Sequence, residues 1–207
     1  MENSRILIWN TEDPAIKVMI EPFGYTTEKI EEGKTLFSEV ETLAETQHKE
    51  YAEQYTVSTE FIEKRTDAET ELHTLRKFSK FIFKNNDDAF NTLALKSSVP
   101  TNFANWLQAA RYYYERLLEH PEWIAILAPF KVTPETIEAN HAILSELKTL
   151  QELRHRETGD AQRATKARDA KFDELNAWCS ELKQLAKLLF EDADAQYLEK
   201  LGIIVKT

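Results

Sequence analysis

The chain reads FGYTTEKIE at residues 23–31 and, 107 positions later, FKVTPETIE at residues 130–138. Outward from these two stretches, the same offset aligns residues 14–87 with residues 121–194 without a gap, and 19 of the 74 aligned pairs are identical. Self-similarity at a fixed offset indicates that a structural unit is repeated. We therefore expect two similar units in one chain.

The composition is typical of a helical protein. Of 207 residues only four are Gly and six are Pro, whereas 42% are hydrophobic and 30% charged. The net charge of −10 argues against a general nucleic-acid binder, which would be basic. No stretch approaches about 20 apolar residues, the N-terminus lacks the features of a signal peptide, and a single Cys excludes an internal disulfide. We expect a soluble, cytoplasmic protein without a transmembrane segment.

Both repeats predict long helices. Residues 34–99 contain neither Gly nor Pro, and apolar residues recur at helical spacing in both copies. Thr26 and Thr133 each precede an acidic first turn and are predicted N-caps, and Pro134 stands at the first helical position, where Pro is favoured. In each copy, one register with alternating spacings of four and three residues has apolar ends and a polar middle.

Two structures satisfy this register. Each copy forms one helix of about 57 residues that pairs with the other as a coiled coil, or each folds back near residues 52–54 and 159–161 into a compact four-helix bundle. Gly159-Asp160 favours a turn, but the matching Ala52-Glu53 carries no turn signal. We predict an all-α fold of two pseudo-symmetric helical repeat units packed as an antiparallel coiled-coil or helical bundle, with long helices favoured.

This interpretation divides the chain into four segments. They are an N-terminal segment (1–13), a first helical repeat (14–99), an aromatic connector helix (100–120) and a second helical repeat (121–207). Residues 103–119 are predicted to be helical, and Pro121 to Leu127 is predicted to form a short helix equivalent to Pro14 to Ile20. The one strand-like pattern is a weak Ile6-Leu7-Ile8.

The C-terminal part of the chain carries a resemblance. Residues 165–178 read TKARDAKFDELNAW, and residues 198–205 read LEKLGIIV. Together with FGYT at residues 23–26, these stretches resemble a family of uncharacterised bacterial all-helical proteins built from two tandem copies of such a unit. The resemblance covers nearly the whole chain and implies the helical fold. The family has no assigned activity, so it implies no functional residue.

The Glu-x-x-His pattern is a candidate metal motif, because paired copies of it build di-iron sites in four-helix bundles. It occurs as Glu45/His48 and, at the matching position, as Glu152/His155. A third case is Glu138 with His141. Arg154 and Arg156 flank His155 and would repel a cation, and the second pair lies off the apolar stripe. We therefore expect solvated helix faces and no bound metal or cofactor, and keep these four residues as candidates.

Two further features have ordinary explanations. Cys179 aligns with Leu72 and occupies a register position, which predicts a buried small apolar side chain rather than a nucleophile. Residues 154–171 carry a run of basic residues interrupted by acidic ones, which is typical of a solvated helix of mixed charge. Its basic members are Arg154, His155, Arg156, Arg163, Lys166, Arg168 and Lys171.

The connector is rich in aromatic residues, and three consecutive tyrosines cannot all face one core. Aromatic side chains concentrate at protein interfaces, so burial within the chain and a protein interface both remain open. The interface candidates are Trp106, Tyr112, Tyr113, Tyr114 and Trp123. Gly-rich phosphate loops and known nucleophile motifs are missing from the sequence. We expect a non-enzymatic interaction or scaffold module that binds a protein partner or itself, with a small-ligand or metal-binding bundle as the alternative.

Overall fold

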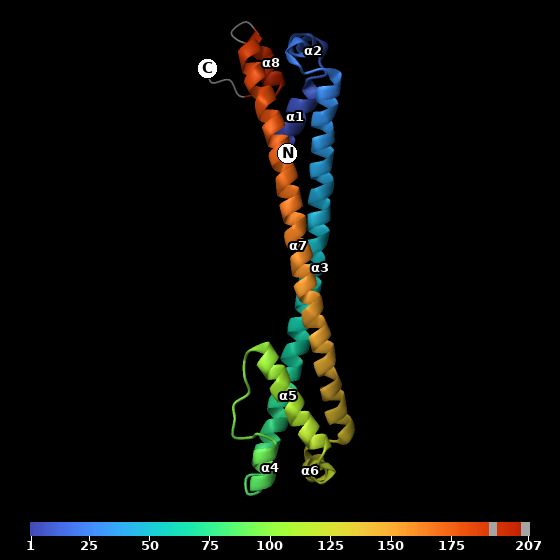
Figure 1. The fold of residues 1–207 in the computed structure, drawn as a ribbon, viewed down its shortest axis with the longest axis vertical. Coiled ribbons are helices and arrows are strands. Elements are labelled where there is room, and N and C mark those ends of the chain that lie inside the picture. Colours follow the sequence, from blue (N-terminus) through green and yellow to red (C-terminus); the bar gives the residue numbers. More distant parts are fainter. Residues whose placement is uncertain (191–193, 204–207) are drawn as a thin grey trace. The chain divides into compact units, whose positions relative to one another are not determined.

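The computed structural model describes residues 1–190 and 194–203, and within these residues every regular element is helical. Figure 1 follows the elements along the chain. They are α1 (Glu2–Asn10), α2 (Pro14–Ile20), η1 (Glu21–Phe23), α3 (Thr27–Ile82), α4 (Asp87–Thr92), α5 (Phe103–Leu118), α6 (Pro121–Leu127), η2 (Ala128–Phe130), α7 (Pro134–Leu189) and α8 (Ala195–Lys200). The fold is all-α, as predicted.

Two long helices dominate the chain. Both α3 and α7 run without interruption for 56 residues, so the hairpin alternative is wrong. The turn signal at Gly159-Asp160 lies inside α7 and has no effect there, because one Gly costs a helix only about 1 kcal/mol. The strand-like Ile6-Leu7-Ile8 is also helical and belongs to α1. There Leu7 and Ile8 are buried, whereas Ile6 is half-buried.

The predicted helix starts are confirmed. The hydroxyl of Thr26 accepts a hydrogen bond from the Lys29 amide at 3.5 Å, and the hydroxyl of Thr133 accepts one from the Thr136 amide at 3.3 Å. Each hydroxyl thus satisfies one of the amides that a helix leaves free in its first turn. Asn102 caps α5 in the same way, through its side-chain oxygen.

The chain forms two compact units, each built from parts of both long helices. Unit 1 comprises Met1–Ala52 with Thr158–Thr207, and unit 2 comprises Glu53–Glu157. These units are defined by packing, and each takes residues from both sequence repeats. We describe each unit by itself.

In unit 1, α3 and α7 pack antiparallel. Glu39 pairs with Lys171 at 3.1 Å, and Gln47 donates to Thr165 at 3.1 Å, so later residues of α3 meet earlier residues of α7. Arg168 donates to Gln47 at 2.6 Å, which satisfies a polar side chain that is only 8% exposed. The apolar core of the unit lies against α1, α2 and α8 and includes Leu7, Ile16, Ile20, Phe37, Val40, Leu175, Trp178, Leu182, Phe190, Leu198 and Leu201.

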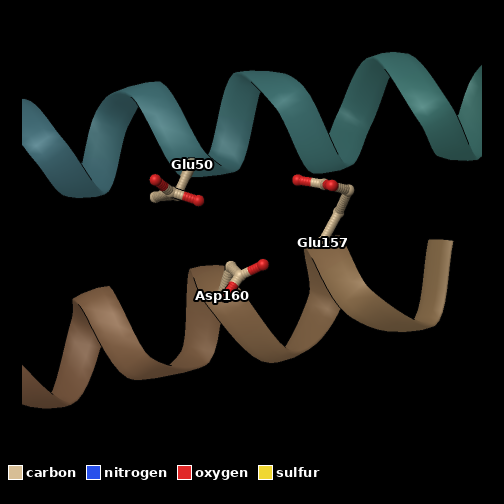
Figure 2. A group of neighbouring side chains, drawn as sticks. All are labelled: Glu50, Glu157 and Asp160. Atoms are coloured by element: carbon tan, nitrogen blue, oxygen red, sulfur yellow. The ribbon is translucent and has the colours of Figure 1, made fainter. Parts of the chain in front are cut away.

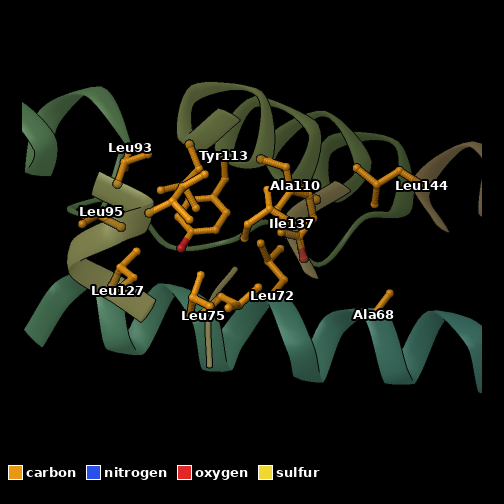
Figure 3. Close-up of a cluster of buried hydrophobic side chains, with 14 of the residues drawn as sticks. Ala68, Leu72, Leu75, Leu93, Leu95, Ala110, Tyr113, Leu127, Ile137 and Leu144 are labelled. Carbon is orange, nitrogen blue, oxygen red and sulfur yellow. The ribbon is translucent and has the colours of Figure 1, made fainter. Parts of the chain in front are cut away.

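In unit 2, the connector helix α5 shares one buried cluster with residues of α3, α6 and α7 (Figure 3). Leu72 and Leu75 of α3 and Ile137 and Leu144 of α7 belong to one buried cluster with Tyr113 of α5. The Tyr113 hydroxyl lies 2.7 Å from the hydroxyl of Ser79, and burial raises the pKa of Tyr113 to about 12. This phenol therefore stays protonated at neutral pH and its buried oxygen keeps a hydrogen-bond partner.

Candidate functional site

The metal candidates lie on exposed helix faces. Glu45 and His48 are exposed on α3 in unit 1, and Glu152 and His155 are exposed on α7 in unit 2. His155 contacts Gln151, its neighbour one turn earlier, at 2.8 Å. None of the four belongs to a group of three metal-ligating side chains among the residues described. Each pair is therefore short of the ligands that a metal site requires.

The third Glu-x-x-His pair is separated by the fold. Glu138 is exposed, whereas His141 turns towards α5, where its Nε2 atom lies 3.6 Å from a carboxylate oxygen of Glu115. This distance exceeds that of a hydrogen bond. His141 thus lies in contact with α5, and Glu138 remains exposed on α7.

Three other carboxylates of the long helices form a group of neighbouring side chains. Figure 2 shows Glu50 projecting from α3 and Glu157 and Asp160 from α7. Glu50 and Asp160 belong to unit 1, and Glu157 is the last residue of unit 2. Asp160 forms an ion pair with Arg163 one turn later. Acidic side chains on exposed helices are common without a bound ion, so these residues carry no metal assignment.

Cys179 behaves as a buried apolar residue. It is 3% exposed, and Leu72, its counterpart in the sequence alignment, is 1% exposed. Burial raises the pKa of the Cys179 thiol, so the reactive thiolate is scarce at neutral pH. A nucleophilic role would need the opposite shift.

We expect Cys179 to react slowly with a thiol reagent in the absence of denaturant, because labelling requires a local opening of unit 1. Ser180 is exposed on the same helix, so the variant Cys179→Ala/Ser180→Cys supplies a matched accessible thiol that should label rapidly. Colorimetric thiol titration compares the two rates. Equal rates would contradict the burial of Cys179.

Three members of the basic run at residues 154–171 pair with carboxylates. Lys171 pairs with Glu39 and Glu174 at 3.1 and 2.7 Å. Arg168 binds Gln47 and Asp169, Arg163 pairs with Asp160, and the Arg154 guanidinium lies 5.3 Å from the centre of the Phe61 ring. These contacts offset part of the positive charge and fit a solvated helix of mixed charge.

Four of the five aromatic interface candidates are buried in the core of unit 2. Trp106, Tyr113, Tyr114 and Trp123 are at most 5% exposed. Tyr112 is 41% exposed, with the guanidinium of Arg116 5.3 Å from its ring centre. The run of three tyrosines is thus resolved by burying two of them. Only Tyr112 among the five remains accessible to a partner.

The most distinctive surface of unit 2 escaped the sequence interpretation. Neither residues 72–86 nor residues 89–114 contain a single Asp or Glu, in a chain whose net charge is −10. Their basic residues are His73, Arg76, Lys77, Lys80, Lys84, Lys96 and Arg111. The sequence indicates this surface only by the absence of Asp and Glu from two segments. A search for motifs that are present does not detect such an absence.

Folding brings these two segments together. The Arg76 side chain reaches from α3 to the segment after α4, where it donates to the carbonyl oxygens of Leu93, Ala94 and Ser97 at 3.3, 2.9 and 2.9 Å. Arg76 is only 7% exposed, and burial lowers the pKa of its guanidinium from the usual value, which still leaves it charged. Within the residues described, no carboxylate forms an ion pair with it.

A hollow of about 500 Å³ opens beside this arginine. It is lined by His73, Arg76, Lys77, Lys80, Ser97, Ser98 and Val99. A second hollow of about 430 Å³ shares Arg76 and the Ser97 to Val99 segment and extends to Tyr112 on α5. The segment from Ser97 to Val99 therefore borders both hollows. The hollow of about 500 Å³ is lined by four basic side chains and by no acidic one.

Four acidic residues of this part of α3 lie along another hollow, which Lys64 also lines. Glu60, Glu63, Asp67 and Glu71 line this hollow, together with Asn140 and Ile143 of α7. None of these four carboxylates lines the hollow beside Arg76, whereas Glu69 lies with Arg65 and His73 along a neighbouring hollow. A helix face with one sign of charge creates a local field that the net charge of the chain does not reveal.

Comparisons with known proteins give no assignment: no protein-family model, no curated protein and no solved structure matches the chain. Across residues 1–190 and 194–203, none of the helices combines the length and the apolar character that a membrane span requires.

Proposed function

We propose that this protein is a non-enzymatic helical interaction module, in which unit 2 binds an acidic segment of a partner protein. The observation that carries the proposal is the hollow between α3 and the loop after α4, whose lining is basic and includes no carboxylate. This surface is defined by His73, Arg76, Lys77, Lys80, Ser97 and Ser98, and we call it the basic face.

Charge complementarity favours an acidic occupant. Lys77 and Lys80 are exposed, and neither forms an ion pair with another described residue. An acidic segment of a partner would supply the carboxylates that these two lysines lack within the described part of the chain. Complementary fields accelerate association and select partners more than they add raw affinity. Tyr112 stands at the neighbouring hollow, where an aromatic contact would add to the electrostatic one.

The test uses a fluorescein-labelled polyglutamate peptide and fluorescence anisotropy. We expect it to bind the intact protein and to bind the double variant Lys77→Glu/Lys80→Glu about tenfold more weakly or worse. Binding should also weaken as salt is added, because charges at a surface are screened beyond about 8 Å at physiological ionic strength.

The matched control is Lys148→Glu/Lys166→Glu, which changes the net charge equally at exposed positions outside the basic face. Equal weakening in both double variants would show that only the net charge matters and would overturn the proposal. Tighter binding of a single-stranded oligonucleotide than of polyglutamate would replace the acidic partner with a nucleic acid. Sedimentation of the protein alone identifies the case in which the acidic partner is a second copy.

We further propose that the chain is a duplicated scaffold, with two pseudo-symmetric repeats whose long helices form an antiparallel coiled coil. Support comes from the element bounds, because α2 and α6, η1 and η2, and α3 and α7 each begin and end 107 residues apart. The register is also consistent, since Leu72 and Leu75 in one copy and Cys179 and Leu182 in the other are all buried.

The short helices α4 and α8, which lie 108 rather than 107 residues apart, end in a similar way. Ala94, with φ 48°, donates to the Asn91 carbonyl at 3.0 Å, and Gly202, with φ 72°, donates to the Glu199 carbonyl at 2.9 Å. The following residue closes a longer hydrogen bond in each case, from Leu95 to Phe90 at 3.0 Å and from Ile203 to Leu198 at 2.9 Å. Both copies thus end this short helix with a left-handed residue.

Replacing Ala94 with Gly should raise the free energy of unfolding of unit 2 by about 0.5–1 kcal/mol, because Ala is strained at positive φ and Gly is not. Gly202→Ala should lower that of unit 1 by about 1 kcal/mol or more. Its new Cβ would also lie 3.0 Å from Cγ2 of Ile6. Urea unfolding with hydrogen exchange measures both effects, and a loss of stability in Ala94→Gly would contradict the equivalence of the two ends.

A further inference from the structure

We propose that the hollow in the basic face is an oxyanion site that receives a phosphoryl group, carried on a phosphorylated serine or threonine of the acidic partner segment. This inference rests on the proposed function and names the chemical group that the partner presents. It is carried by the lining of the hollow, which combines a buried guanidinium, two unpaired lysines and two free hydroxyls.

Arg76 forms the floor of the site. Its guanidinium is buried, donates to three carbonyl oxygens and lies 5.5 Å from the centre of the Tyr113 ring, and no described carboxylate pairs with it. Carbonyl dipoles offset only part of a full positive charge, and a buried cation without a counter-ion is costly. An anion in the adjoining hollow would complete this neutralisation without displacing any of the three hydrogen bonds.

The walls supply mobile cations and hydroxyl donors. His73, Lys77 and Lys80 follow each other at spacings of four and three residues, which places them on one face of α3. Across the hollow, the hydroxyls of Ser97 and Ser98 are exposed and make no hydrogen bond to the part of the chain that the structure describes. A phosphoryl group carries between one and two negative charges and three acceptor oxygens at neutral pH, which matches this set of donors.

Charge and the number of acceptor oxygens favour a phosphoryl group over a carboxylate. A volume of about 500 Å³ lies within the range of pockets that hold ligands, and it leaves room for the side chain that bears the phosphate. Lysines bind phosphate as point charges, and their hydrogen bonds to it are charge-assisted. A carboxylate offers fewer oxygens and less charge, so it would satisfy fewer of these donors.

The test compares three fluorescein-labelled acidic peptides that differ at one central position, which is phosphoserine, glutamate or serine. We expect the phosphoserine peptide to bind at least about tenfold more tightly than the glutamate peptide. That advantage should disappear in Lys77→Ala/Lys80→Ala and shrink in Ser97→Ala/Ser98→Ala. All four positions are exposed, so these variants should fold, which circular dichroism checks. Arg76 is left intact because it holds the loop in place.

Inorganic phosphate provides an independent measurement by nuclear magnetic resonance. Titration with phosphate should shift the amide resonances of Ser97 and Ser98, and these shifts should be absent in Lys77→Ala/Lys80→Ala. Such shifts would support the oxyanion site even if no peptide bound. In that case only the proposal of an acidic protein partner would be overturned. Equal affinity for the phosphoserine and glutamate peptides, with no amide shift, would overturn the oxyanion site. The proposed function would survive that result if polyglutamate still bound the basic face.

Discussion

Replacing Arg76 with Met is expected to lower the free energy of unfolding of unit 2 by about 2–4 kcal/mol. Met keeps most of the apolar stem, so the change isolates the guanidinium. The carbonyl oxygens of Leu93, Ala94 and Ser97 would lose their donors. Hydrogen bonds from a charged donor contribute about 1.5–3 kcal/mol each, and water entering through the hollows would replace part of that. The positive charge that stabilises the C-terminal end of α4 would also be lost.

Hydrogen exchange of unit 2 amides, with urea unfolding, measures this loss. Arg111→Met is the matched control, because Arg111 is exposed on α5 and should change stability by less than about 0.5 kcal/mol. Arg76→Lys keeps the charge but cannot reach three carbonyls in one plane, so we expect an intermediate loss. If Arg76→Met were as neutral as the control, the loop would be held by other contacts, and the floor of the proposed site would be wrongly assigned.

Much of the fold could be predicted because it depends on local patterns. The four-and-three register predicted which face of α3 and α7 is buried, and Thr26, Thr133 and Asn102 mark helix starts by chemistry that acts within one turn. The long helices were preferred over hairpins because Ala52-Glu53 offers no turn residues. The one signal to the contrary, at Gly159, has no effect because a single Gly costs a helix only about 1 kcal/mol.

The basic face could not be predicted in the same way, because it depends on contacts that are distant in sequence. Arg76 meets Leu93, Ala94 and Ser97 only after the chain turns back at α4. Nothing in the periodicity of α3 indicates that this arginine is buried. The aromatic connector failed as a guide for the opposite reason. Its tyrosines resemble an interface by composition, but two of them fill the core that the small unit 2 needs.

Gly33→Ala is expected to lower the free energy of unfolding of unit 1 by about 1–3 kcal/mol, against the usual preference of helices for Ala. The new Cβ would lie 2.7 Å from both Cη2 and Cζ2 of Trp178. Trp178 is 4% exposed, and the Tyr25 ring packs against it edge-on at 5.6 Å, so the indole cannot move aside. Overpacking of this kind typically costs about 1–3 kcal/mol and outweighs a gain in helix propensity of about 1 kcal/mol.

Gly159→Ala is the matched control, because it makes the same change in the interior of α7. There a Cβ would meet only the mobile end of Arg163, at 3.5 Å, so the propensity gain of up to about 1 kcal/mol should appear undiminished. Urea unfolding measures the change in the free energy of unfolding for both variants. A decrease for Gly33→Ala and an increase for Gly159→Ala would show that α7 lies against α3 at Gly33. Adding Trp178→Leu should remove the penalty of Gly33→Ala, since a double-mutant cycle isolates a contact between neighbours. Stabilisation by Gly33→Ala in the intact protein would mean that the indole does not rest on this turn of α3.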